Sequence, residues 1–314
     1  MKVKILGQTE LELTVIGLGT WAIGGPWEVG WGPQDDNESV STILAAVEGG
    51  INWIDTAAIY GLGHSEEVVG RAIKELGERP IIATKCGLVW DRQGRKTNCL
   101  KKDSIMRECE ASLKRLGIDV IDLYQVHWPE PDEQVEEAWE AMSRLAETGK
   151  VRYTGASNFG VSQLERVRRI NPVASLQLPY SLIRRDVEDE LLGYCADNNI
   201  GVVAYSPMQK GLLTGKFSAE RMANLAPDDH RCRDRNFLEP KLSANLRLVE
   251  GLRPIAQRNG LTLAQLAIAW VLRRPEVTAA IVGARRPVQI AETIKAAEAV
   301  LQDEDLAEIE GLLA

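Results

Sequence analysis

Residues 103–127 read DSIMRECEASLKRLGIDVIDLYQVH and contain one complete unit of the fold. Apolar residues recur at helical spacing from Ile105 to Leu116, and Gly117 is the kind of residue that ends a helix. The run Ile121–Tyr124 then has the length and the branched side chains of a buried strand. The segment therefore predicts a helix followed by one strand of a parallel sheet.

The same unit recurs from one end of the chain to the other. The predicted strands are Val15–Leu18, Ile51–Ile54, Ile81–Thr84, Ile121–Tyr124, Val151–Gly155, Ser175–Leu178, Gly201–Ala204 and Ala279–Val282. Eight strands with eight returning segments predict closure into an α/β fold of the (β/α)8 TIM-barrel type, whose usual length is compatible with this chain. No linker or low-complexity segment interrupts the pattern, so we expect residues 1–314 to form a single domain.

Two segments depart from the alternation. Lys4–Leu6 and Leu11–Leu13 flank a short turn and predict an N-terminal β-hairpin that closes the bottom of the barrel. After strand 7, from Gln209 to about Pro240, the alternation fails, and residues 228–235 are densely charged. This long loop is either a lid over the site or a solvated surface, and we favour the lid.

Composition limits the class of protein. Hydrophobic residues make up 45% and charged residues 26% of the chain, as in ordinary compact proteins. The formal net charge of -8 argues against a broad surface for nucleic acid or for anionic lipid. The five cysteines follow no metal-binding spacing, which indicates reduced thiols and a cytoplasmic protein. No apolar run has the length of a membrane span, and the oligomeric state stays open.

Polar side chains follow the predicted strands at their carboxyl ends, where barrel enzymes place catalytic groups. Asp55 and Tyr60 follow the second strand, Lys85 follows the third and His127 the fourth. Each alone has an ordinary structural explanation, such as a cap, a solvated lysine or a packed histidine. Together an ion pair, a proton donor and an imidazole at one mouth favour the reduction of a carbonyl group.

Ordered motifs along nearly the whole chain resemble the aldo-keto reductase family. They are Gly17–Trp21 (GLGTW), Asp55–Tyr60 (DTAAIY), Ala83–Lys85 (ATK), Tyr124–Pro129 (YQVHWP), Gly155–Phe159 (GASNF) and Ile281–Arg285 (IVGAR). Within the family, Trp21–Gly25 and Gly211–Lys216 are most similar to bacterial stress-type reductases that depend on NADPH. A competing dinucleotide motif at Gly61 and Gly63 lacks its third glycine, because Glu66 stands there, so a Rossmann fold is rejected.

The resemblance implies the roles of four catalytic residues. Tyr60 is the general acid that protonates the carbonyl oxygen while hydride reaches the carbon. Lys85 is expected to lower the pKa of Tyr60, which is about 10 in an unperturbed tyrosine. Asp55 would hold Lys85 charged and oriented, and His127 would hydrogen-bond the carbonyl oxygen. No metal is required by this chemistry.

The resemblance also implies where NADPH and a small carbonyl substrate bind. The expected cofactor residues are Gly19, Thr20, Trp21, Ser157, Asn158, Gln177, Tyr205, Ser206, Gly211, Leu213, Gly215, Lys216, Gly283, Arg285, Gln289 and Glu292. Arg285 is expected to bind the 2′-phosphate and to set a preference for NADPH over NADH. Thr293 stands where the family more often has Asn, so this position departs from the family pattern for adenine recognition.

Tryptophans on the predicted mouth loops favour a broad specificity for aldehydes, ketones and aromatic carbonyls. They are Trp21, Trp27, Trp31, Trp90 and Trp128, whereas Trp53, Trp139 and Trp270 are expected in the core. Two other functions stay open. A redox-sensing regulatory subunit, like the potassium-channel β subunits that resemble this family, would bind NADPH and turn over slowly. A barrel enzyme such as an isomerase would use no nicotinamide.

Overall fold

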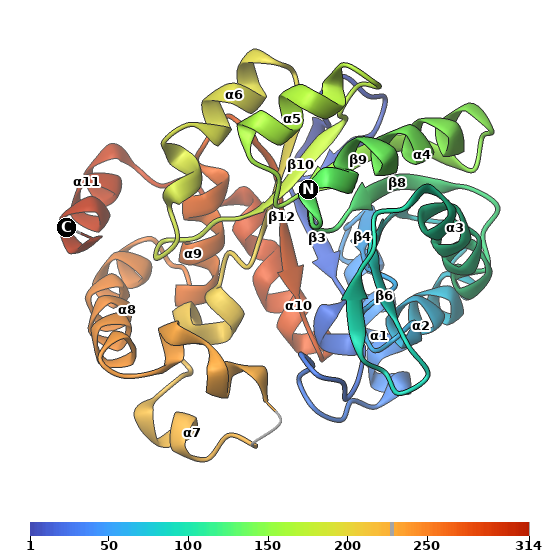
Figure 1. The fold of residues 1–314 in the computed structure, drawn as a ribbon. Coiled ribbons are helices and arrows are strands. Elements are labelled where there is room, and N and C mark those ends of the chain that lie inside the picture. The colour runs from blue at the N-terminus through green and yellow to red at the C-terminus, as the bar shows by residue number, and fades with distance from the viewer. Residues whose placement is uncertain (227–228, 314) are drawn as a thin grey trace.

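Eight parallel strands form a closed barrel in the computed structural model, which describes residues 1–226 and 229–313 (Figure 1). The strands are β3 (Ile16–Gly19), β4 (Trp53–Asp55), β5 (Ile81–Cys86), β8 (Ile121–Val126), β9 (Val151–Ser157), β10 (Ser175–Pro179), β11 (Gly201–Tyr205) and β12 (Val277–Gly283). Their order around the barrel is β3-β4-β5-β8-β9-β10-β11-β12, and β12 pairs with β3 to close it. The predicted fold is confirmed, and all eight strands lie within a few residues of the expected bounds.

Helices surround the strands and bury the outer face of the barrel (Figure 1). Within the described residues they are α1 (Asp36–Glu48), α2 (His64–Ile73), α3 (Lys102–Leu116), α4 (Val135–Glu147), α5 (Val161–Arg168), α6 (Leu191–Asp197), α7 (Ala219–Ala223), α8 (Lys241–Arg258), α9 (Leu263–Leu272), α10 (Pro287–Thr293) and α11 (Asp303–Leu313). Short 3-10 helices are η1 (Trp21–Ile23), η2 (Asp132–Gln134), η3 (Asp186–Glu188), η4 (Gln209–Thr214), η5 (His230–Arg233), η6 (Arg235–Phe237) and η7 (Ile294–Glu298). None of the helices in the described ranges is long and apolar enough to cross a membrane.

Helix α3 shows how the local sequence produces the unit. Ile105, Cys109, Leu113 and Leu116 form its buried face against the barrel. Gly117 adopts a left-handed conformation with φ of 67°, and its amide donates to the carbonyl of Leu113. Such a residue ends a helix without the steric cost that a side chain would bring. The chain can therefore turn directly into β8.

The N-terminal hairpin closes the floor of the barrel as expected. β1 (Val3–Ile5) and β2 (Glu12–Thr14) are antiparallel. Leu6, Leu11 and Leu13 are buried in one cluster with the barrel residue Trp53. At the turn, Gly7 has φ of 54°, and a Cβ there would lie 2.6 Å from the carbonyl oxygen of Ala174, so a side chain cannot be accommodated.

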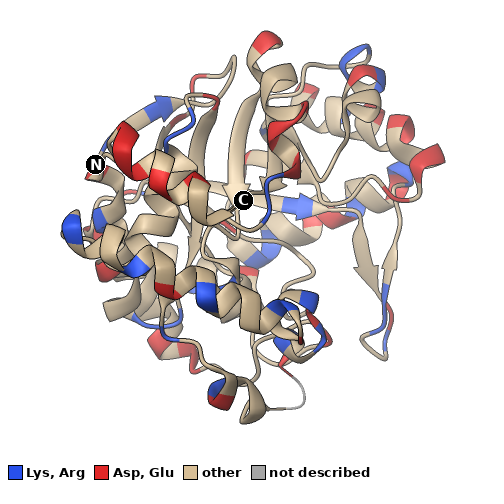
Figure 2. Ribbon diagram, turned by 90° about the vertical axis from the view of Figure 1, so that its left-hand side faces the viewer, with Lys and Arg blue, Asp and Glu red and all other residues tan. Residues whose placement is uncertain are grey.

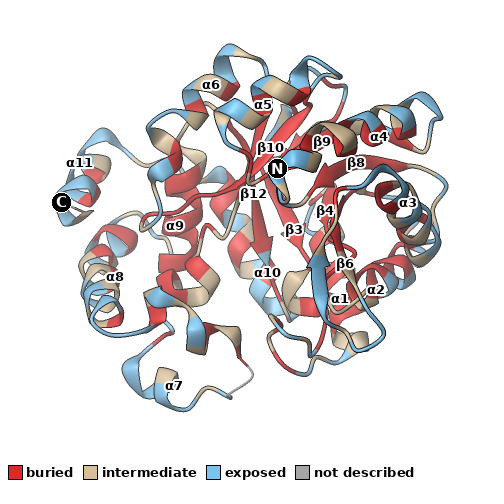
Figure 3. Ribbon diagram, viewed as in Figure 1, coloured by how far each residue is buried: buried red, intermediate tan, exposed pale blue. Residues whose placement is uncertain are grey.

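The barrel interior and the strand–helix interface are mainly apolar, and the catalytic candidates lie at the strand ends. In Figure 3 the barrel strands are largely buried, while the helices are exposed on their outer sides. Trp53, Trp139 and Trp270 are buried, in agreement with their predicted place in the core. Figure 2 shows lysine, arginine, aspartate and glutamate interspersed over the outer helices. The surface therefore has no broad region of one charge in that view.

The segment after β11 differs from the predicted long loop, because it folds into η4, α7, η5 and η6. It has a small core of its own, formed by Leu212, Phe217, Phe237 and Leu242. Part of the charged run is paired within it: Arg231 binds Asp229 at 2.6 Å, and both are buried. Asp228, in the same run, lies outside the described residues. The segment is thus more ordered than a solvated loop.

A second hairpin, which the sequence did not predict, follows β5. β6 (Leu88–Trp90) and β7 (Lys96–Asn98) are antiparallel, and Leu88 pairs with Asn98 (Figure 1). Because it leaves the carboxyl end of a barrel strand, this hairpin lies on the side where the active site of such a barrel is built.

Candidate active site

The carboxyl ends of the strands surround a cavity of about 1010 Å³. Most of the predicted site residues line it: Gly19, Thr20, Trp21, Trp27, Trp31, Asp55, Tyr60, His127, Trp128, Ser157, Asn158, Gln177, Tyr205, Ser206, Gly211, Lys216, Gly283, Arg285, Gln289 and Glu292. Its volume is at the upper end of the range for cavities that hold small molecules and cofactors. The barrel therefore brings residues far apart in the sequence into one site.

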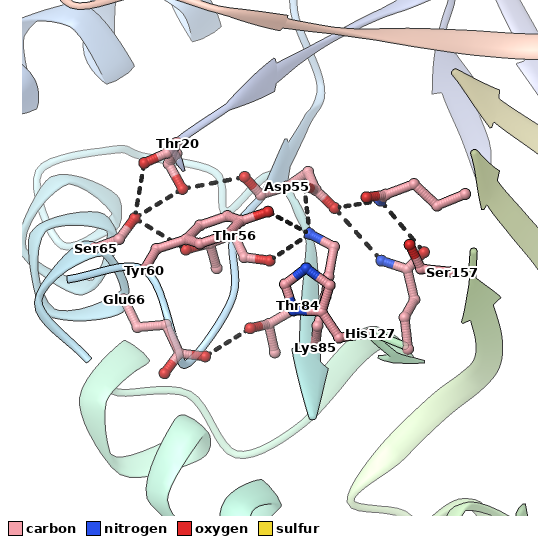
Figure 4. Close-up of polar contacts among 12 residues, drawn as sticks. Thr20, Asp55, Thr56, Tyr60, Ser65, Glu66, Thr84, Lys85, His127 and Ser157 are labelled. Carbon is pink, nitrogen blue, oxygen red and sulfur yellow. Dashed lines mark hydrogen bonds and ion pairs between the residues drawn. The ribbon is translucent and has the colours of Figure 1, made fainter. Parts of the chain in front are cut away.

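Lys85 lies at the centre of the catalytic cluster, just beneath the cavity surface (Figure 4). It is 1% exposed, and its Nζ atom donates to Asp55 Oδ1 at 2.6 Å and to the carbonyl oxygen of Thr56 at 2.9 Å. The same Nζ atom lies 3.4 Å from the hydroxyl oxygen of Tyr60. Since this oxygen accepts from Lys85, the phenol can direct its own hydrogen into the cavity.

Two glutamine side chains hold the other oxygen of Asp55. Gln177 donates from Nε2 to Asp55 Oδ2 at 2.7 Å, and Gln125 donates to the same oxygen at 3.4 Å. Gln125 was not predicted as a site residue, although it lies in the motif that contains His127. The buried carboxylate is thus paired by Lys85 and hydrogen-bonded on both oxygens, as a buried charge requires.

The pKa of Tyr60 is shifted in the direction opposite to the prediction. Burial, and then the negative charge of Asp55, raise this pKa well above its usual value of 10.0. The expected lowering by Lys85 is absent because Asp55 pairs with the ammonium group at 2.6 Å and offsets its field at the phenol. Burial also lowers the pKa of Lys85, and Asp55 opposes that shift. Tyr60 is consequently held as a phenol at neutral pH.

His127 faces Tyr60 across the site, with the two ring centroids 5.8 Å apart and nearly perpendicular (Figure 4). Burial, then the charges of Lys85 and Lys96, lower the pKa of His127 well below its usual value of 6.5. The imidazole is therefore neutral at pH 7. A neutral imidazole has one donor and one acceptor nitrogen, so it can donate a single hydrogen bond into the cavity.

A buried network behind the cluster was not predicted. Thr84, next to Lys85 in β5, donates to Glu66 Oε1 at 2.6 Å (Figure 4). Arg115 donates to Glu66 Oε2 at 2.6 Å. Glu66 is buried on the first turn of α2. The residue that broke the apparent glycine motif therefore has a structural role in linking α2 to β5 and α3.

Asn158 organises the neighbouring wall of the cavity. It adopts a left-handed conformation with φ of 64°, which is uncommon for a residue other than glycine. Its Nδ2 atom donates to the carbonyl oxygen of His127 at 2.9 Å and to Ser157 Oγ at 3.1 Å, and its Oδ1 atom accepts from the hydroxyl of Tyr205 at 2.8 Å. Ser157, Asn158 and Tyr205 thus form a fixed polar wall beside the catalytic cluster.

Two predicted cofactor residues after β11 do not line the cavity. Leu213 is buried in the main core, because its side chain packs among the barrel helices. Gly215 has φ of 69°, and a Cβ there would lie 2.4 Å from Leu263. The positive φ and the close packing explain why glycine stands at position 215. Gly211, by contrast, lines the cavity with φ of 93° and open space beside its Cα.

Arg285 follows β12 and lines the cavity, and its guanidinium group contacts residues 31–34 of the first loop, which follows β3. It donates to Gln34 Oε1 at 2.6 Å and to the carbonyl oxygen of Trp31 at 3.3 Å, and it also donates to the carbonyl oxygen of Pro33. Burial, then the charges of Arg231 and Arg286, lower the pKa of Arg285. Arg285 therefore also tethers residues 31–34, which was not predicted from the sequence.

Helix α10, which follows Arg285, contributes further residues to the cavity lining. Gln289 accepts from the backbone amides of Arg285 and Arg286, and Glu292 pairs with Lys216 at 3.0 Å across the cavity. Thr293 lines the cavity, but its hydroxyl donates to the carbonyl oxygen of Gln289 at 3.0 Å within its own helix.

His230 joins the segment after β11 to the first loop. Its ring lies 4.7 Å from Trp21 and 5.2 Å from Trp31, measured between centroids. Arg231 places its guanidinium 4.6 Å from the centroid of Trp31. Burial, then the charge of Lys210, lower the pKa of His230 to about 4. These contacts connect the two segments on either side of the cavity and favour the lid interpretation over a free surface.

The predicted substrate tryptophans separate into two groups. Trp21, Trp27, Trp31 and Trp128 line the cavity. Trp90 does not, because the β6–β7 hairpin carries it to Arg115, whose guanidinium lies 5.8 Å from its ring centroid. Cavity residues missed from the sequence include the cations Lys96, Arg184, Lys210 and Arg231. Only Arg231 belonged to a segment singled out by its charge.

A barrel that places a phenol, a buried Lys–Asp pair and an imidazole on one cavity has the fold and the site of an oxidoreductase acting on carbonyls. The model of the Aldo/keto reductase family matches residues 15–314, and the chain belongs to this family.

Similar proteins are named for different substrates. The aldo-keto reductase YhdN of Bacillus subtilis (strain 168) is 40% identical, over 100% of this chain and 94% of the relative. The NADH-specific methylglyoxal reductase of Escherichia coli (strain K12) is 36% identical, over 97% of this chain and 96% of the relative. The structure of the glycerol dehydrogenase AKR11B4 from Gluconobacter oxydans superposes with a TM-score of 0.89 and 37% identity, over 99% of this chain and 94% of that one. One of these relatives is named for its specificity for NADH.

Proposed function

We propose that this protein reduces aldehydes and ketones to alcohols with NADPH, and that Tyr60 supplies the proton. One observation carries the proposal: Lys85 Nζ lies between Asp55 Oδ1, at 2.6 Å, and the hydroxyl oxygen of Tyr60, at 3.4 Å, and Tyr60 lines the cavity. This arrangement presents a phenolic hydrogen to the cavity with a cation directly behind it. A carbonyl oxygen in the cavity that gains negative charge would accept this hydrogen, and the cation behind the phenol would stabilise the charge that then develops on Tyr60.

The high pKa of Tyr60 suits a general acid that must remain protonated until it reacts. As the proton leaves, the phenolate forms within reach of the Lys85 ammonium group. Lys85 therefore stabilises the developing phenolate, while burial and the charge of Asp55 keep the pKa of Tyr60 above its usual value. Asp55 keeps Lys85 oriented, and Gln177 and Gln125 keep Asp55 in place.

His127 is suited to orient the substrate. Because its imidazole is neutral, it can donate a hydrogen bond to the carbonyl oxygen without competing with Tyr60 as an acid. The two rings pack against each other, with centroids 5.8 Å apart, and both residues line the cavity. We assign Tyr60 the proton transfer and His127 the positioning of the carbonyl.

NADPH, when bound, supplies the hydride. Ser157, Asn158 and Gln177 offer amide and hydroxyl groups for its carboxamide, and Gln177 retains a free carbonyl oxygen because its NH2 group binds Asp55. Tyr205 would provide a ring surface for the nicotinamide. The remaining expected contacts come from Gly19, Thr20, Trp21, Ser206, Gly211, Lys216, Gly283, Arg285, Gln289 and Glu292, all of which line the cavity.

The preference for NADPH over NADH rests on the cations at the far end of the cavity. Arg285 and Arg286 both line it, and a guanidinium group can bind a phosphate through two hydrogen bonds. Arg285 already donates to the first loop, so phosphate binding would have to retain or exchange those contacts. The E. coli relative named as NADH-specific shows that this preference needs its own measurement.

The experiment is to follow NADPH absorbance with 4-nitrobenzaldehyde over many equivalents. Continued oxidation, well beyond one NADPH per protein, with the alcohol as product supports the proposal. Consumption that stops at one equivalent would favour a redox-sensing regulatory subunit. If neither NADPH nor NADH changes in absorbance or fluorescence with the protein, the proposed function is wrong.

A further inference from the structure

Two cations line the catalytic end of the cavity and have no role in the cluster described above. Lys96 begins β7, in the hairpin that follows the strand of Lys85, and Arg184 lies in the connection after β10. Both side chains are partly exposed, at 40% for Lys96 and 48% for Arg184. They therefore reach solvent-filled space while belonging to the lining of the site.

The charge of Lys96 acts at the reacting centre. Together with Lys85 it lowers the pKa of His127, after the larger effect of burial. Its nearest acidic group is Glu28, at the long distance of 4.0 Å. Since such an exposed, distant pair is weak, the ammonium group is available to a ligand.

Arg184 lines the same cavity, and its charge acts on Tyr205. Burial raises the pKa of Tyr205 to about 12, and the charge of Arg184 opposes that shift more than any other group does. Its acidic neighbour is Asp186, at 3.6 Å, which is itself 68% exposed. A planar guanidinium with this partner keeps donors that can bind a carboxylate.

No acidic group of the described cavity lining offsets these two cations at the catalytic end. Asp55 is neutralised by Lys85 at 2.6 Å. The other lining acids lie elsewhere: Asp234 binds Lys210 at 2.6 Å, Glu292 binds Lys216, Glu38 is close to Arg286, and Asp35 caps α1 by accepting from the amide of Glu38. The substrate region is consequently positive in a protein whose net charge is -8.

We infer that this enzyme prefers carbonyl substrates that carry a carboxylate, and that Lys96 and Arg184 recognise that group. The inference rests on the proposed function and names the substrate class for it. In the reaction, the aldehyde carbon gains hydride from NADPH and the oxygen gains the proton of Tyr60, giving the alcohol and NADP+. The carboxylate itself is unchanged and serves only to orient the substrate.

The test compares 4-formylbenzoate with methyl 4-formylbenzoate, which differ in the charge at the far end. For the wild type we expect a higher kcat/KM with the acid than with the ester. Lys96→Met and Arg184→Met should each reduce the acid-to-ester ratio about threefold to fivefold, as expected for partly exposed charge pairs. Lys96→Glu should reduce it further, and added salt should reduce the wild-type ratio.

Arg92→Met is the matched control, because Arg92 is exposed in the same hairpin and does not line the cavity. This variant should keep the wild-type ratio. The ester isolates the charge effect, since a variant that merely damages the site would slow both aldehydes alike. If both aldehydes are reduced and the ratio is unchanged in Lys96→Glu and Arg184→Met, the inference is wrong while the proposed function stands. If neither aldehyde is reduced, the proposed function itself fails, and the inference with it.

Discussion

Replacing Lys85 by Met tests the buried ion pair and the catalytic cluster together. The change leaves the Asp55 carboxylate, which is 3% exposed, without its cation, and only Gln177 and Gln125 still donate to it. Removing one partner of a buried pair typically costs about 3–5 kcal/mol, because the other charge remains buried and uncompensated. We therefore expect Lys85→Met to lower the free energy of unfolding by roughly this amount at pH 7.

The double variant Lys85→Met with Asp55→Asn separates stability from catalysis. It removes both charges, so it should recover at least half of the lost unfolding free energy. It should not recover turnover, since the group that stabilises the Tyr60 phenolate is still absent. Urea unfolding measures the first effect, and kcat with 4-nitrobenzaldehyde at saturating NADPH measures the second. Two results would refute the reasoning: a single variant as stable as the wild type, or a double variant that regains most of its kcat.

Three further predictions concern the cofactor and the lid. Arg285→Ala should weaken the binding of NADPH about 10- to 100-fold, because a charged hydrogen bond is lost, and the binding of NADH much less. If both dissociation constants rise equally, Arg285 serves only to tether residues 31–34. Amide exchange in residues 209–226 and 229–240 should slow when NADPH binds, and unchanged exchange would leave this segment as surface. His230 is neutral when buried, with a pKa of about 4 against 6.5 for the free side chain, so acidification from pH 6.5 toward 4 favours the opened segment by up to about 1.4 kcal/mol per pH unit. After correction for intrinsic exchange, the protection of residues 230–237 against amide exchange should decrease as the pH is lowered in the wild type and not in His230→Phe. Equal pH dependence in both proteins would contradict this role of His230.

The fold and the catalytic cluster could be predicted because their signals are local. Each barrel strand is a short apolar run, and the polar residue that follows it reaches the mouth of the barrel by topology alone. Asp55, Tyr60, Lys85 and His127 are placed by that rule, and the structure brings them together. The direction of the Tyr60 pKa could not be predicted, because it depends on how burial and the Asp55 charge balance Lys85.

Contacts between loops were missed for a different reason. The contacts of His230 with Trp21 and Trp31 join segments about two hundred residues apart, and no spacing in the sequence indicates these contacts. Likewise, Lys96 lies in a polar stretch without helical or strand periodicity, and only the β6–β7 pairing brings it to the cavity. Trp90 shows the converse: a residue near a strand end can be turned away by the same hairpin.

The most direct test of the central claim is kcat for Tyr60→Phe with 4-nitrobenzaldehyde at saturating NADPH. The variant keeps the ring and loses the hydroxyl that lies 3.4 Å from Lys85 Nζ. Loss of a general acid slows such reactions about 10²- to 10⁴-fold, and the dissociation constant for NADPH should stay close to that of the wild type. Retention of most of the wild-type kcat, with NADPH still bound, would contradict the assignment of Tyr60 as the proton donor.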